Sequence, residues 1–156
     1  MTQQRHERPA PPETLDDDPP VRAVMSRRLV GVDPATPLPT ALRLMVAGTV
    51  RHLPVVREGR CVGMVAEVDL LRGLAARRGP YGMATLLVAD VLRPAVAVPP
   101  DTPLHEVAAR MDDRGTDALL VVEGGRPVGL VTATDLVHAL ARRSGEEGGS
   151  ARAAVP

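Results

Sequence analysis

The sequence lacks lysine, tryptophan and phenylalanine, and it contains one tyrosine and one cysteine. The single cysteine, Cys61, excludes an intrachain disulfide framework and a zinc site built from several cysteines. Without lysine, the chain cannot form the glycine-rich phosphate loop that ends in lysine in many ATPases. With Tyr81 as its only aromatic residue, it has no platform on which successive bases of single-stranded nucleic acid could stack.

Long hydrophobic runs and an excess of one charge are also missing. No apolar segment approaches the ~20 residues that cross a membrane, and the polar, proline-rich start has no signal-peptide core. The 19 basic residues balance 19 acidic ones, so no overall field draws the chain to nucleic acid or to an anionic membrane. These features predict a globular cytoplasmic protein with neither nucleic acid nor membrane as a partner.

The chain contains one segment twice, and each residue of the second copy lies 66 positions after its partner in the first. Residues 36–38, Thr-Pro-Leu, return as residues 102–104, and Asp69 returns as Asp135. About twenty pairs are identical, which is far beyond chance for so short a stretch. Two copies of one unit predict a pseudo-two-fold object in which each copy covers apolar surface of the other. A cleft between such copies is a natural ligand site.

Both copies show the same order of signals, which predicts a strand, a helix, two strands and a second helix in each. This is an α+β arrangement. The strands are expected over residues 29–32, 53–56 and 61–65 in the first copy, and over residues 95–98, 119–122 and 128–131 in the second.

The first helix of each copy has a clear start signal. Thr36 and Thr102 are expected to cap these helices, with Pro37 and Pro103 at the first helical position. Apolar residues at helical spacing are expected to face the core. They are Leu38, Ala41, Leu42, Met45, Val46, Leu70, Leu71 and Leu74 in the first copy, and Leu104, Val107, Ala108, Met111, Leu136, Val137 and Leu140 in the second.

The segments outside the copies differ in composition. Residues 1–19, rich in proline and charge, are expected to form a disordered tail. Residues 20–79 and 88–143 hold the two copies, and residues 80–87 connect them. Residues 144–156, dominated by Gly, Glu, Ser and Ala, are expected to form a second disordered tail.

The most informative polar pattern is Gly129-x-x-Thr132-x-x-Asp135, where the last strand of the second copy enters a helix. Glycine lets another backbone or a ligand approach closely. A carboxylate at the helix entrance can accept two hydrogen bonds from a vicinal diol, and the first helical N–H groups suit an anion. Since Thr-x-x-Asp also caps helices without a ligand, nucleotide contact and capping alone both remain open.

The first copy departs from this pattern. Ala66 stands at the position of Thr132, so the hydroxyl is missing although Asp69 is present. Because the histidines lie at unrelated places, no spacing suggests a metal site.

A second difference between the copies precedes the middle strand. The first copy has the basic pair Arg51 and His52, whereas the second has Asp117 and Ala118. The basic pair is either part of a phosphate site or a solvated loop.

The repeated unit, the Thr-Pro-Leu helix start, residues 51–56 and residues 129–135 together resemble a tandem of CBS domains, or Bateman module. This paired regulatory module occurs in inosine monophosphate dehydrogenase, chloride channels and the gamma subunit of the AMP-activated kinase. The resemblance covers residues 20–143 and leaves no segment for a catalytic or DNA-binding domain. It implies a stand-alone pair of β-α-β-β-α repeats that forms a homodimer.

The resemblance also implies roles for particular residues. In nucleotide-binding CBS pairs, the aspartate of one copy holds the ribose hydroxyls, and the basic pair of the other copy meets the phosphate. Carried over, Asp135 and Thr132 would hold the ribose, while Arg51 and His52 would meet the phosphate. The neighbouring Thr134 would also contact the nucleotide. The adenine slot would consist of Ala97, Val98, Pro100, Thr116, Asp117 and Ala118.

The reciprocal site would pair Asp69 with Ala66 and Asp117. A second carboxylate would then stand where the phosphate should bind, and unpaired like charges in a cleft are costly. We therefore expect one nucleotide per chain and a degenerate second site.

These observations lead to one main hypothesis. The chain would be a non-enzymatic regulatory module, without a metal or cofactor, that binds AMP, ADP, ATP or S-adenosylmethionine between its copies and signals to an unidentified protein partner. The alternative is a constitutive interaction or scaffold protein with an empty cleft, because Ala66 and Asp117 show that ligand groups have been lost. Nothing resembles an activated nucleophile or an acid/base pair, so no enzyme is expected.

Overall fold

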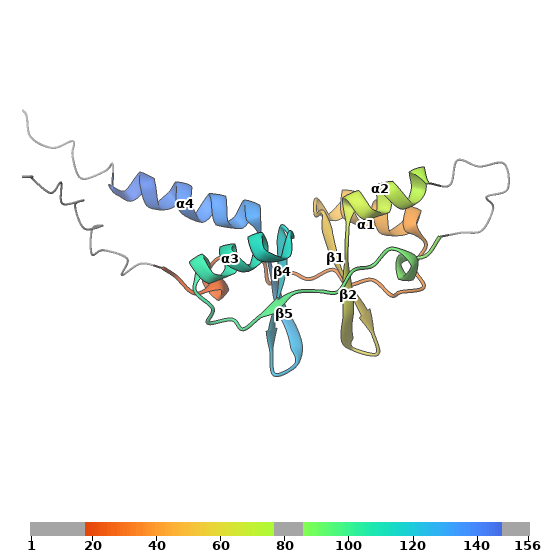
Figure 1. Cartoon of the computed structure of the whole chain (residues 1–156), viewed down its shortest axis with the longest axis horizontal. Helices are drawn as coiled ribbons and strands as arrows, with labels where there is room; N and C mark the ends of the chain where they lie inside the picture. Colours follow the sequence, from red (N-terminus) through yellow and green to blue (C-terminus); the bar gives the residue numbers. More distant parts are fainter. Residues whose placement is uncertain (1–17, 77–85, 148–156) are drawn as a thin grey trace, which may run out of the picture.

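The structure is a computed structural model that describes residues 18–76 and 86–147, and it confirms the α+β fold with two similar halves. Figure 1 shows the halves side by side, with two β-hairpins near the centre whose turns point the same way. The helices lie on the opposite side from these turns. The first half comprises α1 (Leu38–Gly48), β1 (His52–Arg57), β2 (Arg60–Ala66) and α2 (Glu67–Ala75). The second comprises β3 (Ala97–Val98), α3 (Leu104–Arg114), β4 (Ala118–Glu123), β5 (Arg126–Thr132) and α4 (Ala133–Glu147).

The two hairpins are built alike. In β1–β2, His52 pairs with Ala66, and in β4–β5, Ala118 pairs with Thr132, both in antiparallel register. Each hairpin shifts its register at equivalent places, after Val55 in β1 and after Val121 in β4. The strand end that carries the candidate ligand residues is therefore set in the same way in both halves.

The predicted first strand forms in only one half. In the second half, β3 pairs in parallel with β4, and the Leu120 N–H donates to Val96 O at 2.9 Å. In the first half, residues 29–32 make only a single bridge, between Val32 and Val55. The residue equivalent to Leu120 is Pro54, which has no N–H to donate, so the ladder loses a hydrogen bond there.

The expected threonine caps are wrong. Pro37 and Pro103 are themselves the N-cap residues of α1 and α3, and neither helix has a side-chain cap. The Thr102 hydroxyl instead donates to Pro99 O at 2.8 Å. The first N–H of each helix is satisfied by backbone from a distant segment: Leu38 donates to Leu86 O, and Leu104 donates to Pro19 O.

These backbone contacts belong to a crossing of the two leading segments. The first, η1 (Val21–Ala23), precedes the first half but packs in the core of the second, where Val21 is fully buried with Val107. The second, η2 (Val88–Asp90), precedes the second half but packs in the core of the first, where Val88 is fully buried with Leu38. Each core is thus completed by a segment that the sequence assigns to the other copy.

The tail boundaries differ from the expected ones. Asp18, expected within the first tail, accepts hydrogen bonds from the backbone N–H of His105 at 3.2 and 3.3 Å and contacts its ring. Burial raises the pKa of Asp18 while these hydrogen bonds lower it, and the net shift is downward. At the other end, α4 runs to Glu147, so the second expected tail begins inside a helix. Residues 1–17, 77–85 and 148–156, which include most of the expected tails and connector, lie outside the described residues.

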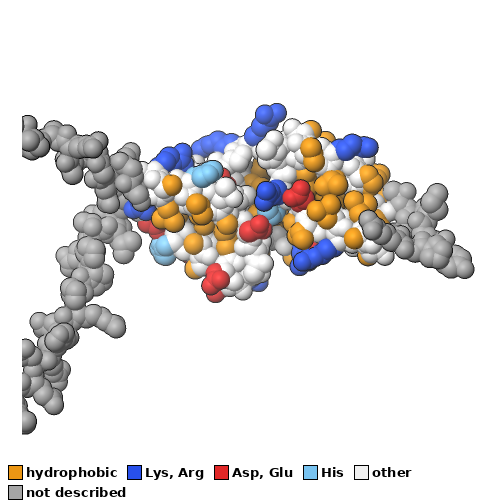
Figure 2. Space-filling view, turned by 90° about the horizontal axis from the view of Figure 1, so that it is seen from above, with side chains coloured by type: hydrophobic (Ala, Val, Ile, Leu, Met, Phe, Trp, Pro, Cys, Tyr) orange, Lys and Arg blue, Asp and Glu red, His pale blue; other side chains and the backbone are white. Residues whose placement is uncertain are grey.

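Several residues expected in the core are exposed instead. They are Val46, Leu71, Ala108, Val137 and Leu140, all on helices. Each half has its hairpin on only one side of its helices, so the outer part of a wide apolar stripe is left uncovered. Figure 2 looks onto this helix side and shows hydrophobic side chains gathered over both halves. No helix of the described segments is long and apolar enough to span a bilayer.

Candidate functional site

A cleft of about 480 Å³ lies between the two halves, and its volume is in the range of small-ligand sites. It is lined by the junction of β5 and α4, by residues around the start of β1, and by the chain that runs from η1 toward α1. We name it the Asp135 cleft. Its lining residues are Ser26, Arg28, Leu29, Val30, Thr49, Val50, Arg51, His52, Pro54, Asp117, Leu130, Thr132, Ala133, Thr134 and Asp135.

Asp135 and Thr132 form the predicted pair at the entrance of α4. The Asp135 Oδ2 atom accepts hydrogen bonds from the backbone N–H of Thr132 at 2.8 Å and from its hydroxyl at 2.9 Å. The Asp135 N–H donates back to the Thr132 hydroxyl at 3.3 Å. Capping is therefore present, and none of these bonds uses Oδ1. The same carboxylate lines the cleft, so capping and contact with a ligand are compatible.

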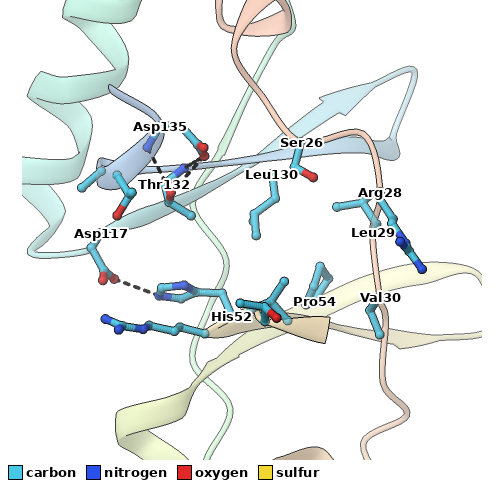
Figure 3. A pocket seen from close by; sticks show the side chains of 15 residues that line it. Ser26, Arg28, Leu29, Val30, His52, Pro54, Asp117, Leu130, Thr132 and Asp135 are labelled. Carbon is cyan, nitrogen blue, oxygen red and sulfur yellow. Dashed lines mark hydrogen bonds and ion pairs between the residues drawn. The ribbon is translucent and has the colours of Figure 1, made fainter. Parts of the chain in front are cut away.

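His52 crosses the cleft to the other half. Its Nε2 lies 2.9 Å from Asp117 Oδ1, and the histidine is only 9% exposed while Asp117 is 72% exposed. Figure 3 shows this pair below Thr132 and Asp135, with Leu130 extending toward Pro54 beside it. Asp117 therefore contacts one member of the Arg51-His52 pair, which the sequence analysis expected to meet a phosphate.

Arg51 is more loosely held than its neighbour. Its side chain is 83% exposed, and its Nε lies 3.9 Å from Glu67 Oε2. Arg28 also lines the cleft, so two arginines contribute positive charge to it.

Of the residues predicted to form the adenine slot, the structure brings only Asp117 to the Asp135 cleft. Ala97 lines a separate depression between the hairpin tips, and Val98 is buried in the core of the second half. The Pro100 carbonyl accepts the Arg22 N–H. Thr116 and Ala118 line the other cleft between the halves.

The apolar wall of the Asp135 cleft comes from a different segment. Leu29 and Val30 supply it together with Val50, Pro54 and Leu130. The sequence analysis missed the first two because it assigned the slot to the leading segment of the second copy. Residues 21–25, Val-Arg-Ala-Val-Met, resemble residues 88–92, Val-Ala-Asp-Val-Leu. This similarity was the available signal that the leading segments are equivalent, but it does not say which half each segment packs against.

The second cleft, which we name the Asp69 cleft, has a volume of about 350 Å³. Ala66 and Asp69 line it, as expected for the degenerate site, and Asp69 is only 7% exposed. Its Oδ1 accepts hydrogen bonds from Arg93 Nη2 at 2.8 Å and from Arg93 Nε at 3.1 Å. The carboxylate equivalent to Asp135 is thus already occupied by a guanidinium.

The chemistry available in the Asp135 cleft is binding chemistry. It combines a carboxylate acceptor, hydroxyl groups, basic side chains and an aliphatic wall. Across the residues that the structure describes, no group of three or more His, Cys, Asp or Glu is placed to hold a metal ion. The arrangement suits a ligand that is apolar at one end, has a diol in the middle and is anionic at the other end.

Known proteins share this fold. A crystal structure of an uncharacterized conserved protein from Pyrococcus horikoshii is 30% identical with a TM-score of 0.70, covering 79% of this chain and 92% of that one. The CBS domain pair of protein MJ0100, in complex with 5′-methylthioadenosine and S-adenosyl-L-methionine, is 21% identical with a TM-score of 0.73, covering 81% and 99%. The CBS domain of a bacterial CNNM/CorC family Mg²⁺ transporter, in complex with ATP, is 25% identical with a TM-score of 0.68, covering 79% and 87%.

No curated protein sequence matches the chain. The family model of the CBS domain matches it twice, over residues 21–76 and 88–142. These two matches span the greater part of the sequence and correspond to the repeat. The chain therefore belongs to the CBS domain family.

Proposed function

We propose that this protein is a regulatory module that binds one adenosyl compound per chain in the Asp135 cleft. The observation that carries the proposal is the opposition of Asp135 and Thr132 from one half to Arg51 and His52 from the other, across a cleft of ligand size. A ligand held by both halves ties them together, so its binding changes how they pack. That change is the signal a protein partner would detect.

In this proposal each part of the ligand meets a different part of the cleft. The ribose hydroxyls bind the Asp135 carboxylate, because a carboxylate accepts two hydrogen bonds from a vicinal diol, with Thr132 and Thr134 beside it. A phosphate or other anionic group meets Arg51 and His52. The base lies against Val30 and the other aliphatic residues of the wall.

The relatives support the chemical class. The MJ0100 pair is in complex with 5′-methylthioadenosine and S-adenosyl-L-methionine, and the transporter domain is in complex with ATP. Adenosine is the part common to all three ligands. Its ribose is also the part that Asp135 would contact, so the proposal names adenosyl compounds as a class, with AMP, ADP, ATP and S-adenosylmethionine as candidates.

A thermal-shift screen of the full chain tests this proposal. We expect at least one of AMP, ADP, ATP, S-adenosylmethionine and NAD to raise the melting temperature, because a ligand that binds only the folded state stabilises it by RT ln(1 + [L]/Kd). GTP, which carries guanine in place of adenine, tests whether the site distinguishes the two bases. If no compound raises the melting temperature at millimolar concentration, the protein is a scaffold with an empty cleft. Chromatography of the ligand after incubation should show it unchanged, as expected of a module that binds its ligand without reacting with it.

Asp117 controls how much negative charge the ligand can carry. Its carboxylate engages His52, the group expected to meet a phosphate. Replacing Asp117 with alanine removes a like charge and frees His52. Because the Asp117 side chain is 72% exposed, the dielectric of water applies, and the repulsion removed is about 1 kcal/mol for two unit charges about 4 Å apart. We expect roughly fivefold to tenfold tighter binding of ATP in this variant and little change for adenosine, both measured by calorimetry. Equal gains for both ligands would contradict this role.

The exposed helix surface supports a homodimer. Six large hydrophobic side chains on helices remain at least 38% exposed: Leu44, Val46, Val68, Leu71, Val137 and Leu140. Exposed apolar patches of this kind mark interaction sites.

Charged substitutions on this surface test the dimer. The changes Val46→Asp and Val137→Asp are expected to shift sedimentation from dimer to monomer, because each buries a charge in the interface. Val62→Asp, an exposed valine on β2, is the matched control and should leave the dimer intact. A monomeric unmodified protein would exclude the dimer.

A further inference from the structure

Ser26 and Arg93 occupy the same place in the two halves. Ser26 exchanges two backbone hydrogen bonds with Leu130 of β5, both of 2.9 Å. Arg93 exchanges two with Met64 of β2, of 2.8 and 2.9 Å. Met64 and Leu130 are partners in the repeat, 66 residues apart. The backbone therefore places Ser26 beside the Asp135 cleft and Arg93 beside the Asp69 cleft in equivalent positions.

The two side chains have opposite effects on their clefts. The serine is short and lines the Asp135 cleft. The side-chain hydrogen bonds of Asp135 within the described part of the chain go to Thr132, not to Ser26. The arginine reaches into the Asp69 cleft and binds Asp69 through Nη2 and Nε. Arg72 is a weaker neighbour, with its Nη1 at 3.9 Å from the same oxygen. One aspartate is available to a ligand, and the other is already paired.

We infer that Arg93 acts as an internal substitute for a ligand in the Asp69 cleft. The residue at this position, serine in one half and arginine in the other, then decides which cleft can accept a nucleoside. This inference rests on the proposed function of the Asp135 cleft, but it concerns a different residue and can be tested without any nucleotide.

The physical basis is the burial of Asp69. A carboxylate that is only 7% exposed needs a partner, because an unpaired buried charge is strongly destabilising. The guanidinium of Arg93 gives Asp69 two charge-assisted N–H hydrogen bonds. A ribose diol could also give two hydrogen bonds, but it carries no positive charge. A nucleoside would have to displace Arg93 from Asp69, in a cleft that already lacks the threonine hydroxyl.

The first experiment needs no nucleotide. Arg93→Ala is expected to lower the melting temperature by at least about 4 °C, because it leaves Asp69 unpaired. Arg72→Ala, which removes the more distant cation, should lower it by clearly less. Millimolar methylguanidinium should raise the melting temperature of the Arg93→Ala variant, because it can enter the vacated place, and should leave the unmodified protein unchanged. Equal losses in the two variants, together with no effect of methylguanidinium, would overturn the inference.

The second experiment transfers the arginine to the other half. In Ser26→Arg, the new guanidinium is expected to pair with Asp135 and to weaken binding of AMP and S-adenosylmethionine by at least about tenfold, measured by calorimetry. Ala23→Arg places the same side chain on the same segment but outside the cleft, and it should bind as the unmodified protein does. Ser26→Arg binding as tightly as the unmodified protein would overturn the inference.

The two experiments separate the two proposals. If neither AMP nor S-adenosylmethionine binds the unmodified protein, the proposed function fails. The response of the Arg93→Ala variant to methylguanidinium then still decides the role of Arg93. If the probes bind but Ser26→Arg has no effect, the role of this position fails while the Asp135 site stands.

Discussion

Asparagine in place of Asp135 is expected to weaken binding of an adenosyl compound by at least about 100-fold. The carboxylate can accept two hydrogen bonds from the ribose diol, and bonds to a charged acceptor contribute about 1.5–3 kcal/mol each. The amide of asparagine has one acceptor oxygen, so it cannot reproduce both bonds. It can still accept from the backbone N–H of Thr132, which keeps the start of α4 in place. Calorimetry with AMP and S-adenosylmethionine measures the loss, and urea unfolding checks the fold.

Asp69→Asn is the matched control for this experiment. Asp69 occupies the equivalent position in the other half but is bound by Arg93. Its replacement should leave affinity within about threefold of the unmodified protein, which corresponds to less than about 1 kcal/mol. Comparable losses in both variants would contradict a single site per chain, and no loss in Asp135→Asn would remove Asp135 from the site.

Alanine in place of Gly63 is expected to lower the free energy of unfolding by about 1–3 kcal/mol, the usual cost of inserting an atom into a packed region. A Cβ atom at this position would lie 2.6 Å from Leu92 Cδ1 and 2.7 Å from Arg93 O. The leucine side chain can rotate away. The Arg93 carbonyl cannot, because it accepts the Met64 N–H at 2.8 Å. The substitution must therefore displace the crossing segment.

Gly48→Ala is the control for this prediction. A Cβ atom there has Val50 Cγ2, at 3.5 Å, as its nearest neighbour, and Gly48 is the last residue of α1. Alanine should leave stability unchanged or raise it slightly, since alanine favours helix over glycine. Urea unfolding of both variants measures the difference, and a similar effect at the two positions would show that the close approach at Gly63 is not tight.

The repeat made the two hairpins predictable. Identical spacing of apolar residues and glycine turns fixes the pairing of strands close in sequence, and the structure has β1–β2 and β4–β5 in those places. The juxtaposition of Asp135 with His52 was expected from the resemblance to paired CBS domains, in which the aspartate of one copy faces the basic pair of the other, and both residues line the same cleft.

The adenine slot could not be predicted in the same way. Its wall depends on which half each leading segment packs against, and local patterns contain no such information. Leu29 and Val30 reach the cleft because residues 21–26 cross to the second half before the chain returns to the first. The guanidinium on Asp69 was missed for a related reason, since Arg93 lies 24 residues away in sequence and approaches only through the second crossing.

Helix surfaces were mispredicted for another reason. Val46 lies at core spacing on α1 but is 71% exposed. A periodic pattern identifies an apolar face, but it does not say whether the same molecule or a second copy covers that face.

The exchange of leading segments makes each half unable to complete its own core. Val21 fills the second half and Val88 fills the first, so separating the halves would remove a fully buried side chain from each. The two halves should consequently unfold in one cooperative transition. In a hypothetical ancestor with a single copy, the leading segment of one molecule would have packed into the core of a second molecule, and the reverse. Such an exchange is called domain swapping. Duplication within one chain turns that swap between molecules into an internal one, and it frees the two copies to diverge. Serine in one copy and arginine in the other, at the same backbone position, are an example of such divergence.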